Sequence, residues 1–191
     1  MKVGLDCDEV LCSLIKPIFR YLNQRLGRER PFVALDSFYL WEFFDIERAE
    51  AVRLVHDFYD TSAFPLVQAV DGAVEGVTSL SSRRHELYVI TSRPATLQVP
   101  TETWLAKHFG DAFSGIHLTN GFGKEGPVRH KRDICDFLGI DVFVDDHVPN
   151  VSSCNSPKRE VVLFDRQWNR GTDEFPRVRS WEELVTYIGS L

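Results

Sequence analysis

Lys2-Val-Gly-Leu-Asp6-Cys-Asp8-Glu-Val10 is the stretch that most strongly constrains the fold. A short apolar run ends there in two carboxylates, Asp6 and Asp8. We interpret residues 2–6 as a buried strand, and side chains two apart on a strand point to the same side. Both carboxylates can therefore face one crevice at the strand end. An acidic turn that caps the following helix is the alternative interpretation.

A second apolar run, residues 87–90, leads into Thr91, Ser92 and Arg93. The two hydroxyls, with backbone N–H groups after a strand, can donate to phosphoryl oxygens. Arg93 could reach a second anionic group or a ribose of a substrate, or it could pair with a surface carboxylate. Ser or Thr before Pro also caps helices and turns, so this segment alone does not decide the function.

A third apolar run, residues 142–144, ends in Asp145 and Asp146. Burying two adjacent carboxylates without a partner is costly. The run therefore indicates a cation at the tips of both side chains. We expect Asp145 to bind it directly or through water, and Asp146 to hold the metal or its water shell.

Lys131 opens a predicted helix that leads to this acidic strand. A lysine there could neutralise phosphoryl oxygens and hold the Asp6 carboxylate. Lys124 and Lys107 compete for the same role, and the position of Lys131 favours it.

Together these residues indicate phosphoryl transfer. Asp6 would attack phosphorus and form an aspartyl phosphate. Asp8 would protonate the leaving oxygen and later deprotonate water. Close carboxylates repel each other and a hard divalent cation relieves this, so Mg²⁺ is expected on Asp6, Asp8, Asp145 and Asp146.

Apolar strands alternate with helical segments along most of the chain, which predicts an α/β fold with a parallel sheet. Strands are expected at 2–6, 86–90, 114–118, 141–144 and 160–164, and helices at 72–83, 101–109, 131–138 and 181–188. Residues 120–127 and 149–157 are rich in Gly, Pro and Asn and are expected to be loops.

Residues 13–63 have helical periodicity instead, with helices expected near 14–26 and 47–59. We expect this insertion to form a helical cap over a core made of residues 1–12 and 64–191. Its aromatic stretch, residues 38–44, includes Phe38 and Trp41, which could stack on a nucleobase. The alternative is that these aromatics form the small core of the cap.

The composition excludes several classes. Of 191 residues, 43% are hydrophobic and 26% are charged, so the chain can build a core. The formal net charge of −6 argues against a nucleic-acid polymer as partner. No uncharged apolar stretch is long enough for a membrane span, and no apolar leader precedes Asp6. The four cysteines lack zinc spacing, so we expect reduced thiols in a cytoplasmic protein.

The order of Asp6-Cys-Asp8-Glu-Val10, Thr91, Lys131 and Asp145-Asp146 resembles the four motifs of the haloacid dehalogenase superfamily. An Asp two residues after the nucleophile, as Asp8 is here, is the pattern of its phosphatases. The resemblance implies a three-layer Rossmann-like core, Mg²⁺ and a mobile cap. An insertion between the first two motifs is similar to the small helical C1-type caps of that superfamily.

A closer resemblance extends over most of the chain, to the bacterial branch of the cytosolic type C 5′(3′)-deoxyribonucleotidases. It is carried by residues 90–94, 103–105, 131–146, 162–165 and 168–169. It implies removal of phosphate from a deoxynucleoside monophosphate. Whether the chain forms a homodimer is left open by the sequence. The alternatives are another small phosphate ester such as a sugar phosphate, a receiver domain, and a silent phosphate-binding protein.

Overall fold

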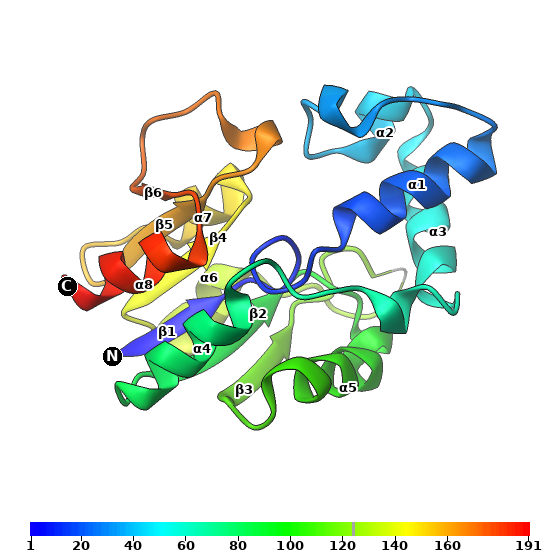
Figure 1. Cartoon of the computed structure of the whole chain (residues 1–191). Helices are drawn as coiled ribbons and strands as arrows, with labels where there is room; N and C mark the ends of the chain where they lie inside the picture. The colour runs from blue at the N-terminus through cyan, green and yellow to red at the C-terminus, as the bar shows by residue number, and fades with distance from the viewer. Residues whose placement is uncertain (124) are drawn as a thin grey trace.

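The computed structural model describes residues 1–123 and 125–191, and its centre is a six-stranded parallel sheet (Figure 1). The strand order is β3-β2-β1-β4-β5-β6, so the sheet extends from β1 to both sides. The strands are β1 (Lys2–Leu5), β2 (Glu86–Thr91), β3 (Phe113–Leu118), β4 (Val142–Asp145), β5 (Glu160–Phe164) and β6 (Arg177–Val178). The predicted α/β fold with a parallel sheet is confirmed.

Eight α-helices accompany the sheet within the described residues. They are α1 (Ile15–Leu26), α2 (Leu40–Phe44), α3 (Arg48–Tyr59), α4 (Ala73–Ser82), α5 (Gln98–Phe109), α6 (Lys131–Leu138), α7 (Val148–Cys154) and α8 (Trp181–Gly189). Short 3₁₀ turns lie at η1 (Phe32–Ala34), η2 (Phe64–Leu66), η3 (Ala95–Leu97) and η4 (Gln167–Asn169).

Side chains of β2, β4 and β5 alternate between two apolar layers, which makes the core three-layered. Val3 and Leu5 of β1 pack in one cluster with residues of α4, α5 and α8. Phe143 of β4 and Leu163 of β5 point to the opposite face, where they pack with α6 and α7. Strands buried on both faces read as continuous apolar runs, which is why the sequence revealed them.

The expected loop at 149–157 is wrong for its first two thirds, because Val148–Cys154 is the helix α7. Pro149 lies in the first turn, where its missing N–H has no helical partner to lose. The proline therefore starts the helix instead of breaking it. Strand β6 was not predicted, since two residues are too short for a periodic signal.

Helices α1, α2 and α3 lie apart from the sheet (Figure 1), and their buried side chains continue the apolar cluster that covers one face of the sheet. Phe19 is central to this part of the cluster, with its ring centroid 5.1 Å from that of Phe44 and 5.2 Å from that of Phe32. Phe43 is 5.5 Å away. Part of the aromatic stretch is thus cap core, as the alternative interpretation proposed.

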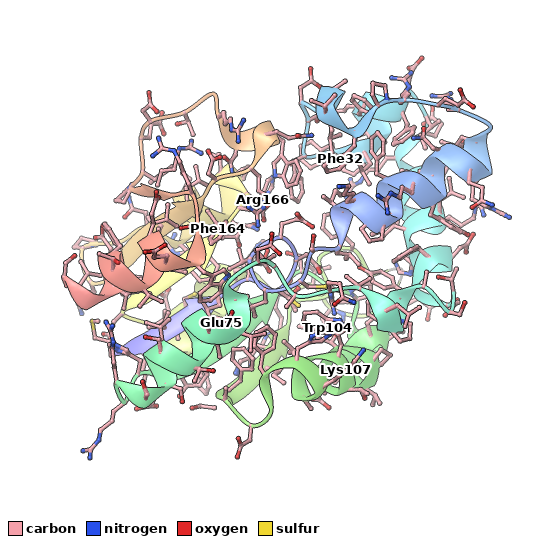
Figure 2. All side chains as sticks on the ribbon, in the orientation of Figure 1. Phe32, Glu75, Trp104, Lys107, Phe164 and Arg166 are labelled. Carbon is pink, nitrogen blue, oxygen red and sulfur yellow. The ribbon has the colours of Figure 1, made fainter. Side chains whose placement is uncertain are left out.

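Helix α5 is tied to the segment by which the chain returns from these helices to the sheet. Trp104 Nε1 donates to the carbonyl oxygen of Val67 at 2.8 Å, and Lys107 Nζ donates to that of Pro65 at 3.1 Å (Figure 2). The four cysteines are free and buried. Among the described residues, the helices are too short or too polar to cross a bilayer.

Candidate active site

The carboxyl ends of three neighbouring strands carry the residues that the sequence singled out. β1 lies between β2 and β4, so Asp6, Thr91 and Asp145 come to one edge of the sheet. The Asp6 N–H donates to the carbonyl oxygen of Val144 at 2.9 Å, which continues the pairing of β1 with β4. Parallel pairing alone therefore gathers residues that lie far apart in the sequence.

Three buried carboxylates, those of Asp6, Asp145 and Asp146, form a cluster at this edge. Each offers one oxygen, and these oxygens lie within 4.8 Å of one another. Lys131 Nζ reaches two of them, at 2.8 Å from Asp6 Oδ1 and 2.7 Å from Asp145 Oδ2. Although burial alone would lower it, Asp145 and Asp6 hold the pKa of Lys131 above its usual range.

Asp145 is the most heavily hydrogen-bonded member of the cluster. Its Oδ1 accepts from the backbone N–H of His147 at 2.8 Å, and Asn150 Nδ2 donates to its Oδ2 at 3.1 Å. Together with Lys131, these donors fix the plane of the carboxylate. Helix α7, where the sequence suggested a loop, supplies Asn150.

The cluster carries more negative charge than its own donors neutralise. Burial raises the pKa of Asp6 to about 7, although Lys131 works in the opposite direction. Burial, followed by the neighbouring Asp145 and Asp6, raises the pKa of Asp146 well above its usual range. Three hard oxygen donors with one lysine suit a divalent cation such as Mg²⁺, which would relieve this repulsion.

Asp8 lies outside this cluster and faces Arg93 instead. Arg93 Nη2 donates to Asp8 Oδ1 at 2.7 Å, and Nε lies 3.2 Å from both oxygens. The expected role of the Asp8 carboxylate as a metal ligand has no counterpart in the three-carboxylate cluster of the described residues. The Asp8 side chain is 29% exposed, so it stays open to the cavity.

Arg93 is buried, and its guanidinium donates hydrogen bonds to other side chains of the protein. Besides Asp8, its Nη1 donates to Thr101 Oγ1 at 3.0 Å, and its Nη2 lies 3.4 Å from Cys12 Sγ. Burial opposes its charge, but Asp8 holds the pKa of Arg93 above its usual range. Arg93, which was considered as a substrate-binding residue, thus holds Asp8, the carboxylate expected to act as general acid.

The remaining predicted residues differ in their placement. Thr91 is buried, and its Oγ1 accepts from the N–H of Arg93 at 3.3 Å, while Ser92 borders the cavity beside it. Of the lysines weighed against Lys131, Lys107 bonds to Pro65 and Lys124 lies outside the described residues.

A cavity lies between the cap helices and the sheet edge, with Asp6 and Asp8 in its wall. Phe38 and Trp41 border it, and Phe38 also stacks on His147 with ring centroids 3.8 Å apart. Most of the cap side is aliphatic and consists of Ile15, Ile18, Leu35, Leu40, Val52 and Val55.

Glu9 is a site residue that the sequence did not reveal. Its backbone is left-handed at φ 62°, and its Oε1 accepts from the N–H of Ile15, the first residue of α1. Burial raises the pKa of Glu9 to about 7. Glu9 thus joins the loop after β1 to the start of the cap.

Trp168, Asn150 and His147 also border the site and were not assigned roles from the sequence. Trp168 Nε1 donates to Asp146 Oδ2 at 2.8 Å. The available signal was the Trp168-Asn169 pair in the block that resembles the deoxyribonucleotidases. For Asn150, the surrounding prolines suggested a loop.

A family model described as "5' nucleotidase, deoxy (Pyrimidine), cytosolic type C protein" matches residues 1–190. The chain belongs to this family. It is a hydrolase of the phosphomonoesterase class, as its sequence motifs predicted. The receiver-domain alternative is thereby excluded.

Two relatives are described as 5′(3′)-deoxyribonucleotidases, one from Bacillus subtilis and one from Bacillus phage SPbeta. Each is 26% identical to this nucleotidase over 187 residues, which cover 95% of both chains.

Solved structures agree on the haloacid dehalogenase fold. A predicted phosphatase from Clostridium acetobutylicum superposes with a TM-score of 0.71 at 17% identity, covering 100% of this chain and 98% of that one. A haloacid dehalogenase-like hydrolase from Streptococcus pneumoniae gives 0.69 at 15% identity, covering 98% and 97%. At this identity the likeness concerns the fold alone.

Proposed function

We propose that this nucleotidase is a Mg²⁺-dependent 5′(3′)-deoxyribonucleotidase that works through an aspartyl phosphate on Asp6. The observation that carries the proposal is the position of Asp6, whose carboxylate borders the cavity and is held by Lys131 at 2.8 Å. The names of the Bacillus relatives support the substrate class. A cytoplasmic location is proposed from the family description.

In the first half-reaction an oxygen of Asp6 attacks phosphorus and the ester oxygen leaves, so one P–O bond forms as another breaks. Asp8 enters this step protonated and gives its proton to the leaving oxygen, and the fork of Arg93 stabilises the carboxylate that results. Lys131, the Thr91 hydroxyl and N–H groups after β2 stabilise the phosphoryl oxygens. Water, deprotonated by Asp8, then cleaves the acyl phosphate and returns Asp6.

Asp6, Asp145 and Asp146 would hold the cation. Bound there, Mg²⁺ supplies positive charge to the phosphoryl oxygens and offsets the repulsion among the carboxylates. The protein's own contribution is the fixed orientation of Asp6 by Lys131 and of Asp145 by Lys131 and Asn150.

The cavity favours a nucleoside over a free sugar as the leaving group. A sugar phosphate would turn several hydroxyls towards the aliphatic wall formed by Ile18, Leu40 and Val55, where they would lose hydrogen bonds to water. A planar base can instead pack against Phe38 and Trp41. The aromatic and aliphatic lining thus supports a nucleoside monophosphate.

The test is phosphate release from deoxyribonucleotides, ribonucleotides and sugar phosphates, with and without Mg²⁺. Asp6→Asn should lower release by roughly 10³-fold or more while the fold is kept, since the nucleophile is lost. Asp173→Asn, at an exposed position, is the matched control and should match the wild type. A preference for sugar phosphates would discard the substrate, and an active Asp6→Asn variant would discard the mechanism.

A further inference from the structure

The turn after β5 contacts the acidic cluster and the cap at the same time. It contains η4, in which Gln167 Nε2 donates to the carbonyl oxygen of Phe32 in the cap at 2.8 Å. Arg166, the residue just before η4, and Phe32 border one hollow between core and cap (Figure 2). Trp168, the residue after Gln167, reaches the acidic cluster.

The Trp168 indole joins the leaving-group cavity to the Asp146 carboxylate. The side chain borders that cavity, and its Nε1 donates to Asp146 Oδ2 at 2.8 Å. Among the described residues, this is the side-chain donor that the structure provides to the Asp146 carboxylate, whereas Asp145 has Lys131 and Asn150. The orientation of Asp146 therefore depends on one indole.

The backbone around Trp168 is held firmly enough for this role. Asn169 is buried, and its Nδ2 donates to the carbonyl oxygens of Asp146 at 2.7 Å and Phe164 at 2.8 Å. Arg177 Nη1 donates to Asn169 Oδ1 at 2.6 Å. η4 is thus fixed both to Asp146 and to the strands beside it.

We propose that Trp168 is a positioning residue that holds Asp146 in the orientation needed to bind the divalent cation. One Asp146 oxygen is engaged by the indole, which leaves the other to join the oxygens of Asp6 and Asp145. Hydrogen-bond donors to ligating carboxylates commonly contribute 10- to 100-fold in metal affinity. The proposal rests on the metal site of the proposed function.

The test is the affinity of the metal-free protein for Mn²⁺, measured by calorimetric titration. Trp168→Phe keeps an aromatic ring but removes the N–H, so we expect affinity to fall by about 10-fold or more. The matched control is Trp181→Phe, which removes an N–H that is donated to the Val10 carbonyl oxygen and not to a carboxylate of the cluster. Trp168→Leu gives a second variant without a side-chain donor if Trp168→Phe does not fold.

A wild-type-like affinity in folded Trp168→Phe would overturn the proposal while leaving the metal site intact. Absence of Mn²⁺ binding in the wild type would overturn both this proposal and the metal site. In activity assays, the Mg²⁺ concentration for half-maximal rate should rise by the same factor in Trp168→Phe, and kcat at saturating Mg²⁺ should recover. An equal loss of affinity in Trp181→Phe would show a general structural effect and would also overturn the proposal.

Discussion

Arg93 illustrates how one side chain can serve both stability and chemistry. Its head group is fully buried, and its fork binds Asp8, whose side chain is 29% exposed. Arginine suits this task because its planar donors fix both oxygens of a carboxylate. The general acid is thereby held in one orientation before a substrate enters.

We expect Arg93→Met to lower the free energy of unfolding by about 1–3 kcal/mol, since Asp8 loses its partner but keeps access to water. kcat should fall by roughly 10- to 100-fold, because the proton donor is no longer fixed. Denaturant unfolding and steady-state assays measure the two effects.

The matched control is Arg53→Met, which breaks the exposed Arg53–Asp57 pair at 2.8 Å. Exposed pairs of this kind contribute up to about 1 kcal/mol. Equal effects of the two substitutions on stability and kcat would contradict the role assigned to Arg93.

The sequence revealed the site residues that follow apolar strands and missed those that depend on tertiary contacts. Asp6, Thr91 and Asp145 each end a buried run, and parallel strands bring such ends together. The bond from Arg93 to Asp8 spans 85 positions, and no local pattern indicates which carboxylate the arginine meets. The bond from Trp168 to Asp146 is hidden for the same reason.

At the scale of elements, predictions succeeded where local signals agreed with each other. α6 and β5 have the predicted bounds 131–138 and 160–164 because periodicity and flanking breakers coincide. α7 failed because Pro149 and the polar residues around it suggest a loop when read one by one. Its helical state depends on Val151 and Cys154, which pack against the sheet.

The packing of α4 against α8 gives a prediction at this scale. A Cβ on Gly76 of α4 would lie 2.3 Å from Trp181 Cε3 of α8, and Trp181 is buried. We expect Gly76→Ala to lower the free energy of unfolding by about 1–3 kcal/mol through overpacking. Thermal and denaturant unfolding of the variant measure this.

Gly189→Ala is the matched control, because Gly189 is also helical but its Cβ would meet only the flexible end of Arg83. Removing a helical glycine there should change stability by between about 0 and 1 kcal/mol in the favourable direction. Destabilisation by both substitutions to the same extent would show that the indole contact is not the cause.

Across the whole molecule, two of the contacts between cap and core involve His56 and Gln167. His56 Nε2 of α3 lies 2.8 Å from the carbonyl oxygen of Phe122, and Gln167 bonds to the cap at Phe32. Both contacts involve loops after strands, so they can break without loss of sheet or helix structure. Cap closure is thus compatible with the exchange of substrate and product.

The acidic cluster makes the stability of the whole molecule depend on pH and on metal. Burial raises the pKa of Asp6 and of Glu9 to about 7 each, and it also raises the pKa of Asp146 well above its usual range. In the metal-free protein the folded state therefore binds more protons than the unfolded state between about pH 4 and about pH 7. Stability contributed by these groups is present below about pH 4 and is lost as the pH rises through about 7.

At neutral pH a saturating divalent cation should reverse this loss, because it binds the folded cluster and not the unfolded chain. At about 100 times the dissociation constant the gain is about 2.7 kcal/mol, a rise in melting temperature of roughly 5–10 °C. Asp6→Asn removes one carboxyl group with a raised pKa and one proposed ligand of the cation. The melting temperature of this variant should therefore fall less with rising pH and respond less to Mg²⁺. Thermal unfolding with EDTA or Mg²⁺ across this pH range measures both slopes. If the wild type and Asp6→Asn showed equal slopes and equal responses to Mg²⁺, Asp6 would not be part of the cation site and the prediction would be wrong.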